Sequence, residues 1–129
     1  MKRTWKIFYY EDENGRSDIQ EFIDSQKERA QAKVFAWLSQ LEQHGPNLPR
    51  PYADLLADGI HELRINLSGN QIRILYFFCF KEFIILTHAF SKRTSKVSKK
   101  EINKARKYRE DFLARYELKK LREISDEKL

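Results

Sequence analysis

Residues 59–92 constrain the fold of this chain more than any other stretch. Two turn signals, a Ser-Gly-Asn turn within 67–70 and a Lys-Glu turn at 81–82, separate three segments rich in Ile, Phe, Tyr and Thr. Aromatic and β-branched residues favour strands, and turn residues at this spacing favour hairpins. The stretch therefore predicts three consecutive antiparallel strands.

Pairing the strands across a four-residue loop at 67–70 and a two-residue turn at 81–82 places Arg64 opposite Arg73 and Arg73 opposite Phe90. Side chains alternate between the two faces of a strand, which divides the residues into two sets. One face collects Glu62, Arg64, Arg73, Leu75, His88, Phe90 and Lys92, and the other collects Leu63, Ile65, Ile72, Ile74, Tyr76, Ile85 and Ala89.

The apolar face predicts a core. On the polar face, two like-charged residues directly opposite each other repel, so an arginine pair beside a histidine suggests a site for an anionic ligand. The alternative is an ordinary solvated outer face, on which charged residues need no special explanation.

The whole chain has 129 residues, which fits a single domain over 1–129 with one core. The lone Cys79 has no partner for a disulfide and is interpreted as a buried packing residue, as expected in a reducing cytoplasm. No apolar run is long enough to span a bilayer, and the N-terminus lacks the apolar block of a signal peptide. We therefore expect a cytoplasmic protein.

Helices are predicted on both sides of the three strands. Residues 4–10 read as a first strand, and Ser17 with Gln20 marks the start of a short helix. A second helix from about residue 27 stops at the His-Gly-Pro sequence of 44–46. Ser98 begins a long C-terminal helix, and the tail from about residue 123 is expected to fray.

Charge is unevenly distributed along the chain. The net charge is +6, yet segment 92–122 alone contains 13 Lys or Arg and 4 Asp or Glu. A strongly cationic end favours polyanionic partners, nucleic acid above all. A lysine-rich solvated helix is the alternative that charge alone leaves open.

The residue types exclude several kinds of chemistry. The three histidines are widely spaced, the single cysteine has no partner, and no cluster of carboxylates offers oxygen ligands, so metal catalysis is poorly supported. There is no phosphate-binding glycine loop and no serine nucleophile motif. What remains, Arg, Lys and one His beside an aromatic ring, suits metal-free cleavage of RNA, which carries its own nucleophile in the 2′-OH.

Three segments carry a family resemblance: DGIHELRI at 58–65, RILYF at 73–77 and ILTHAFSKRTSKVSKKEINKAR at 85–106. Together with the order of elements over about 5–116, they resemble the RelE/HigB superfamily of type II toxins, in its phage-derived HigB-like branch. The resemblance implies an α+β, small RelE-like fold, with an antiparallel twisted sheet of about four strands, two N-terminal helices and one C-terminal helix. It also implies a ribosome-dependent, metal-independent mRNA endonuclease without a cofactor.

The resemblance further implies partners: the ribosome and mRNA, a cognate helix-turn-helix antitoxin that is HigA-like, and operator DNA only through the antitoxin complex. By the same resemblance, Arg73 matches the strand arginine that contacts the scissile phosphate, and Arg64 matches a basic position on the preceding strand. Lys92 or Arg93 supplies the second cationic group, and His88 serves in general acid or base catalysis. The residues expected to bind RNA are Phe90, Lys96, Lys99, Lys100, Lys104 and Lys107.

One departure concerns base stacking. Some RelE proteins place a C-terminal tyrosine on the substrate base, and this chain has no tyrosine between Lys92 and Tyr108, so Phe90 is the substitute. Two other functions remain open: an RNA- or ribosome-binding inhibitor of translation that does not cleave, and a toxin that acts mainly as corepressor with its antitoxin.

Overall fold

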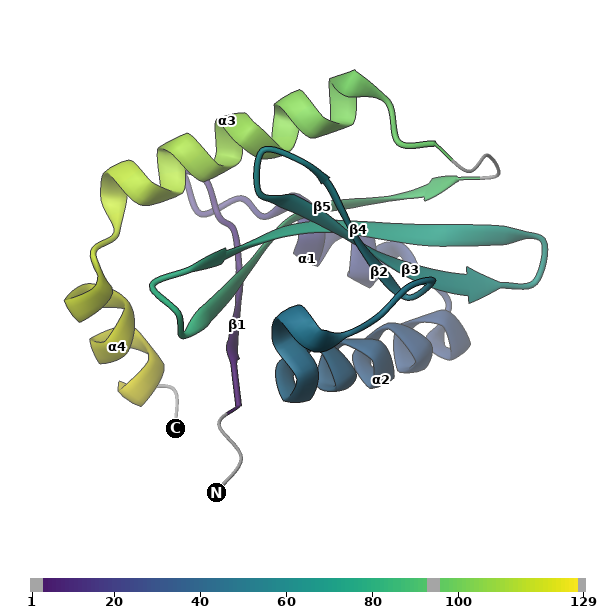
Figure 1. Cartoon of the computed structure of the whole chain (residues 1–129), viewed down its shortest axis with the longest axis horizontal. Coiled ribbons are helices and arrows are strands. Elements are labelled where there is room, and N and C mark those ends of the chain that lie inside the picture. Colours follow the sequence, from purple (N-terminus) through teal and green to yellow (C-terminus); the bar gives the residue numbers. More distant parts are fainter. Residues whose placement is uncertain (1–3, 93–95, 128–129) are drawn as a thin grey trace.

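The structure, a computed structural model, describes residues 4–92 and 96–127. In chain order its elements are β1 (Lys6–Tyr9), α1 (Asp18–Ser25), α2 (Glu28–His44), a short 3-10 turn η1 (Gly45–Asn47), β2 (Ala53–Ala57), β3 (Ile60–Leu67), β4 (Asn70–Cys79), β5 (Phe83–Lys92), α3 (Lys99–Arg115) and α4 (Leu118–Glu127) (Figure 1).

These elements form one mixed sheet in the order β1-β5-β4-β3-β2. Strands β2 to β5 are antiparallel to one another, whereas β1 runs parallel to β5 at the edge. The α+β class is confirmed, and the sheet gains one strand in β2, which the sequence analysis left unassigned. An Asp58-Gly59 turn with positive φ at both residues joins β2 to β3, as tight hairpins require.

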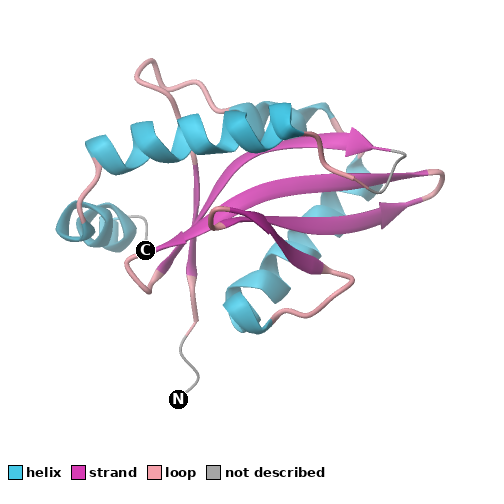
Figure 2. Cartoon of the chain, turned by 45° about the horizontal axis from the view of Figure 1, so that its top comes forward, coloured by secondary structure: helices cyan, strands magenta, loops and turns pink. Residues whose placement is uncertain are grey.

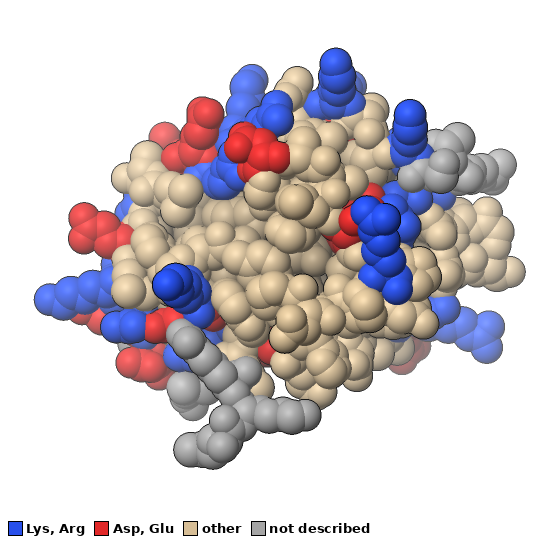
Figure 3. All heavy atoms as spheres, viewed as in Figure 1, with Lys and Arg blue, Asp and Glu red and all other residues tan. Residues whose placement is uncertain are grey.

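Helices cover both faces of this sheet (Figure 2). Helices α1 and α2 pack on one face, and α3 crosses the other. Ser17 caps α1 as predicted, accepting from the Gln20 amide at 3.1 Å. The C-terminal helix is divided into α3 and α4 by non-helical residues at 116–117. Lys and Arg side chains project along the edge of the molecule that α3 occupies (Figure 3).

Helix α2 ends where the sequence predicts, at Gly45. This residue has a φ of 49°, and a Cβ at its position would lie 2.3 Å from the indole nitrogen of Trp5. Any larger residue would therefore clash with Trp5, which directly precedes β1.

The predicted register is confirmed at the arginines. Arg64 pairs with Arg73, and Arg73 pairs with Phe90. The turn that produces this register differs from the prediction, because the loop spans residues 80–82 and pairs Cys79 with Phe83.

A β-bulge at Thr87 compensates for the longer loop. Leu75 pairs with His88 and Tyr76 pairs with Leu86, so Thr87 is the extra residue on β5. Before the bulge, side chains of β5 face the side opposite to the one expected. Ile85 consequently packs under α3, and its predicted place on the other face was wrong.

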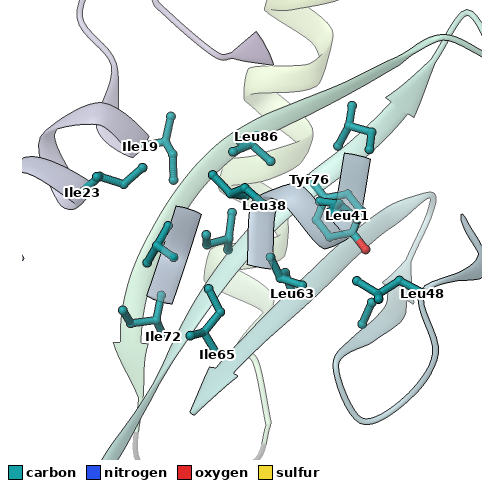
Figure 4. Packing of buried hydrophobic residues seen from close by; sticks show 14 residues of the cluster. Ile19, Ile23, Leu38, Leu41, Leu48, Leu63, Ile65, Ile72, Tyr76 and Leu86 are labelled. Carbon is teal, nitrogen blue, oxygen red and sulfur yellow. The ribbon is translucent and has the colours of Figure 1, made fainter. Parts of the chain in front are cut away.

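Two hydrophobic clusters result. The cluster between the sheet and α1–α2 is mainly aliphatic, with Ile19, Leu41, Leu63 and Ile72 among its buried members (Figure 4). The cluster under α3 contains Cys79, which is buried as predicted, and burial raises the pKa of its thiol to about 12. No helix in the described part of the chain is long and apolar enough to cross a membrane.

Candidate functional site

The polar residues predicted to share one face do so. Pairing across β3, β4 and β5 aligns Glu62 with Leu75 and His88 in one row, and Arg64 with Arg73 and Phe90 in the next. This face, which we call the polar face, is not a solvated surface, because α3 packs over it and buries its centre.

Arg73 lies at the buried centre of the polar face, with only 2% of its side chain exposed. Its guanidinium donates to the Glu62 carboxylate through Nη1, and to the Gln71 side-chain oxygen through Nε at 3.1 Å and Nη2 at 2.7 Å. The anion that the sequence analysis expected beside Arg73 is thus supplied by the chain itself.

Arg64 is the more accessible of the two arginines, with 25% of its side chain exposed. It donates to Glu62 at 3.2 Å and lies 3.5 Å from the Asp54 carboxylate on β2. Glu62 therefore bridges Arg64 and Arg73, and this shared carboxylate offsets the repulsion expected of a directly opposed arginine pair.

His88 is 2% exposed and is surrounded by aromatic rings and charges. Its ring stacks on Phe90 with 5.8 Å between centroids and meets Tyr108 of α3 edge-on at 6.0 Å. Burial and the Lys104 ammonium lower the pKa of His88 to about 4, against the opposing effect of the Glu101 carboxylate. The imidazole is neutral near pH 7 and available as a proton acceptor.

A pocket of about 310 Å³ opens between the end of β5 and the start of α3. Its lining residues are Phe90, Ser91, Lys92, Ser98, Lys100 and Glu101. Phe90, a predicted RNA-binding residue, and Lys92, a predicted catalytic cation, therefore share one depression next to His88. Arg93, the alternative second cation, lies outside the described residues.

The predicted RNA-binding lysines differ in availability. Lys96, Lys99, Lys100 and Lys107 are exposed. Lys104 is instead paired with a carboxylate, its Nζ lying 3.1 Å from the Asp18 Oδ2 at the start of α1, although 43% of its side chain is exposed. The described part of the chain contains no group of three His, Cys, Asp or Glu side chains placed to hold a metal ion.

Residues 21–110 match a family model described as Phage derived protein Gp49-like (DUF891). The chain belongs to this family. No curated protein matches it significantly. The Gp49-like stretch contains the whole polar face and most of α3, whereas β1 and α4 lie outside it.

Three further residues of this Gp49-like site carry no role in the sequence analysis: Asp54, Glu62 and Glu101. All three are carboxylates that contact a predicted site residue. The alternation of Glu62 with Arg64 on one strand was the available signal for the first contact. The other two depend on how β2 and α3 pack, which no local pattern reports.

Proposed function

We propose that this Gp49-like protein is the toxin of a type II toxin–antitoxin system, a HigB-like member of the RelE superfamily. It would act as a ribosome-dependent, metal-independent mRNA endonuclease that inhibits translation. Family membership carries the proposal, because the matched stretch spans the polar face and the basic helix beside it. The α+β fold supports it.

In the proposed reaction, the ribose 2′-OH attacks the adjacent phosphorus and the 5′-oxygen leaves. Arg64 and Lys92, the more accessible cations of the site, stabilise charge on the phosphate, and His88 transfers a proton. Arg73 reaches the phosphate by exchanging its contact with Glu62 for a phosphate oxygen. Phe90 supports a base at the wall of the pocket.

Docking and control are assigned to other surfaces. The exposed lysines of α3 and the segment before it contact ribosomal RNA, where each phosphate contact adds salt-dependent affinity. A helix-turn-helix antitoxin neutralises the toxin, and operator DNA is bound only through that complex.

A second candidate is a translation inhibitor that occupies the ribosome without cleaving. The burial of Arg73 and His88 favours it, since both groups are 2% exposed and would need a rearrangement to touch RNA. This candidate predicts arrested translation without new mRNA ends.

Mapping of 5′ ends on a reporter mRNA separates the two candidates. The protein is induced without antitoxin, and the message is either translated or lacks its start codon. Arg64→Ala tests the site, and Arg29→Ala, an exposed residue on α2 across the sheet, is the matched control.

Cuts within in-frame codons that require translation, persist in Arg29→Ala and fall by about 100-fold or more in Arg64→Ala would support the endonuclease, because phosphate-stabilising groups contribute effects of this size. Translation arrest without new ends would favour occupancy. Cuts that persist in Arg64→Ala would remove Arg64 from the site.

A further inference from the structure

The surroundings of Thr87, the bulge residue, fix the direction of its hydroxyl proton. Its hydroxyl lies 3.1 Å from the Leu75 carbonyl oxygen, and both groups are buried. A carbonyl oxygen only accepts hydrogen bonds, so the hydroxyl must donate its single proton to Leu75. The oxygen of Thr87 is then left with acceptor capacity alone.

Because the Thr87 oxygen can only accept, it determines which tautomer of His88 is present. Nδ1 of His88 lies 3.1 Å from the Thr87 hydroxyl oxygen. Because that oxygen has already given its proton to Leu75, Nδ1 must be the donor. Nε2 then carries the lone pair.

The opposite tautomer, with the proton on Nε2 of His88, satisfies fewer hydrogen bonds. If the Thr87 hydroxyl donated to Nδ1, its oxygen would face the Leu75 carbonyl at 3.1 Å with no proton between them. An Nε2 proton would gain only the Glu101 carboxylate at 3.5 Å, which is at the long limit of a hydrogen bond.

Nε2 is buried and has no hydrogen-bond partner within residues 4–92 and 96–127. It points at the Glu101 carboxylate, so two proton acceptors face each other with no donor. The other charged or polar groups that act on the ring are Lys104 and Asp18, with the Tyr108 hydroxyl donating to Asp18. Buried polar atoms are rarely left unpaired, so Nε2 calls for a hydrogen-bond donor.

We infer that Thr87 is a positioning residue that holds His88 with Nε2 as proton acceptor, and that a hydroxyl of the bound RNA, the ribose 2′-OH, donates to Nε2 in place of the Glu101 carboxylate. The inference rests on the proposed function for the identity of the hydroxyl. Glu101 lines the pocket shared with Phe90 and Lys92 and also contacts the imidazole. Its partly exposed side chain is thus the group that the RNA must displace.

The corresponding step makes His88 the general base. Nε2 takes the 2′-OH proton, the 2′-oxygen forms a bond to phosphorus, and the bond from phosphorus to the 5′-oxygen breaks. The leaving oxygen takes a proton from solvent, which gives a 2′,3′-cyclic phosphate and a 5′-hydroxyl end. The imidazolium then returns its proton to solvent.

The tautomer is tested without any activity, by correlating ring nitrogens and carbon-bound protons of His88 in NMR spectra of the ¹⁵N-labelled full chain near pH 7. We expect a protonated Nδ1 and an unprotonated Nε2. Thr87→Val, which keeps the shape and removes the hydroxyl, should shift the ring toward Nε2–H, and Thr87→Ser should restore the Nδ1–H form. A wild-type ring protonated mainly at Nε2 would overturn the inference, even if Thr87→Val fails to fold.

The role of the unpaired Nε2 of His88 is tested by single-turnover cleavage of ribosome-bound mRNA. Thr87→Val should lose about tenfold or more in rate, with Thr87→Ser restoring much of it, because only the correct tautomer of a general base reacts. Glu101→Gln places an amide donor on Nε2 and should also reduce the rate.

Activity in the wild type should fall as pH falls through the pKa of His88, as expected for a base. A rate that rises on acidification would overturn the general-base role. Absence of cleavage in every variant would instead refute the proposed function, and the NMR spectra would still decide the tautomer.

Discussion

The two faces of the sheet are built from the same strands but bury different kinds of side chain. The face under α1 and α2 buries a mainly aliphatic cluster whose strand members include Leu63, Ile72 and Ile74. The face under α3 also buries Glu62 and Arg73, although it contains a hydrophobic cluster of its own. Neighbours on β4 illustrate the contrast, since Ile74 and Arg73 are adjacent in sequence and face opposite sides.

The contrast indicates that one face mainly stabilises the fold, whereas the polar face mainly holds side chains in fixed positions. Apolar burial is non-directional and contributes roughly 25 cal/mol per Å², so the α1–α2 side stabilises the fold with little demand on geometry. A buried charge is tolerated only with a well-placed partner. The polar face therefore holds a few side chains in fixed positions at some cost in stability, as expected of a functional site.

The largest expected effect is on the polar face. Arg73→Met leaves Glu62 buried with Arg64 alone, and loss of one partner of a buried ion pair costs about 3–5 kcal/mol. Urea denaturation measures the change. The double variant Glu62→Leu, Arg73→Met should recover most of it, because no uncompensated charge remains. A single variant as stable as the wild type would show that the network has no structural role.

On the opposite face, Ile74→Ala should destabilise the fold by about 2–5 kcal/mol through lost burial and the cavity that remains. The same urea titration reports it, with the exposed Phe35→Ala on α2 as control. If the two faces are separable, Ile74→Ala retains the wild-type rate of the proposed mRNA cleavage per folded molecule. A lower rate would mean that the apolar face also positions the site.

Acidification should destabilise the fold through His88, which lies on the polar face. Its pKa is lowered to about 4 in the folded chain from an ordinary value near 6.5, so the unfolded chain binds the extra proton first. The neutral imidazole favours folding fully above pH 6.5, and stability is lost as pH falls from 6.5 to 4, by about 3 kcal/mol at most. The difference in stability between wild type and His88→Gln, followed over this range, isolates the effect. A difference that does not vary with pH would contradict it.

The smallest effects concern the two helix caps, one on each side of the sheet. Ser17→Ala removes the partly buried N-cap of α1 and should lower the free energy of unfolding by about 1 kcal/mol. Ser98 caps α3 through a longer, exposed contact of 3.4 Å, so Ser98→Ala should cost only about 0.5 kcal/mol. Thermal unfolding of both variants compares them, and equal losses would refute the difference.

The fold was predictable where the pattern is local. Turn residues and alternation gave the three strands and the opposition of Arg64, Arg73 and Phe90, and capping residues gave the starts of α1 and α3. The longer loop at 80–82 and the bulge at Thr87 were missed, because each shifts the register by one residue and the two shifts cancel at the arginines.

The candidate site was predictable only as a set of positions. Spacing placed the arginines and His88 on one face, but it did not report that α3 would cover them or that Glu62, Asp54 and Glu101 would pair with them. Such contacts join residues from five separate elements, and their formation depends on packing between elements.

The sequence by itself determined most of the element types, the central strand pairing and the Gp49-like family, because these follow from residue propensities and short motifs. The tertiary structure decided which charges are buried, which are neutralised by the chain itself, and which nitrogen of His88 lacks a hydrogen-bond partner among the described residues. The physical reason is that desolvation and hydrogen-bond partners are properties of three-dimensional surroundings, which alternation along a strand does not encode.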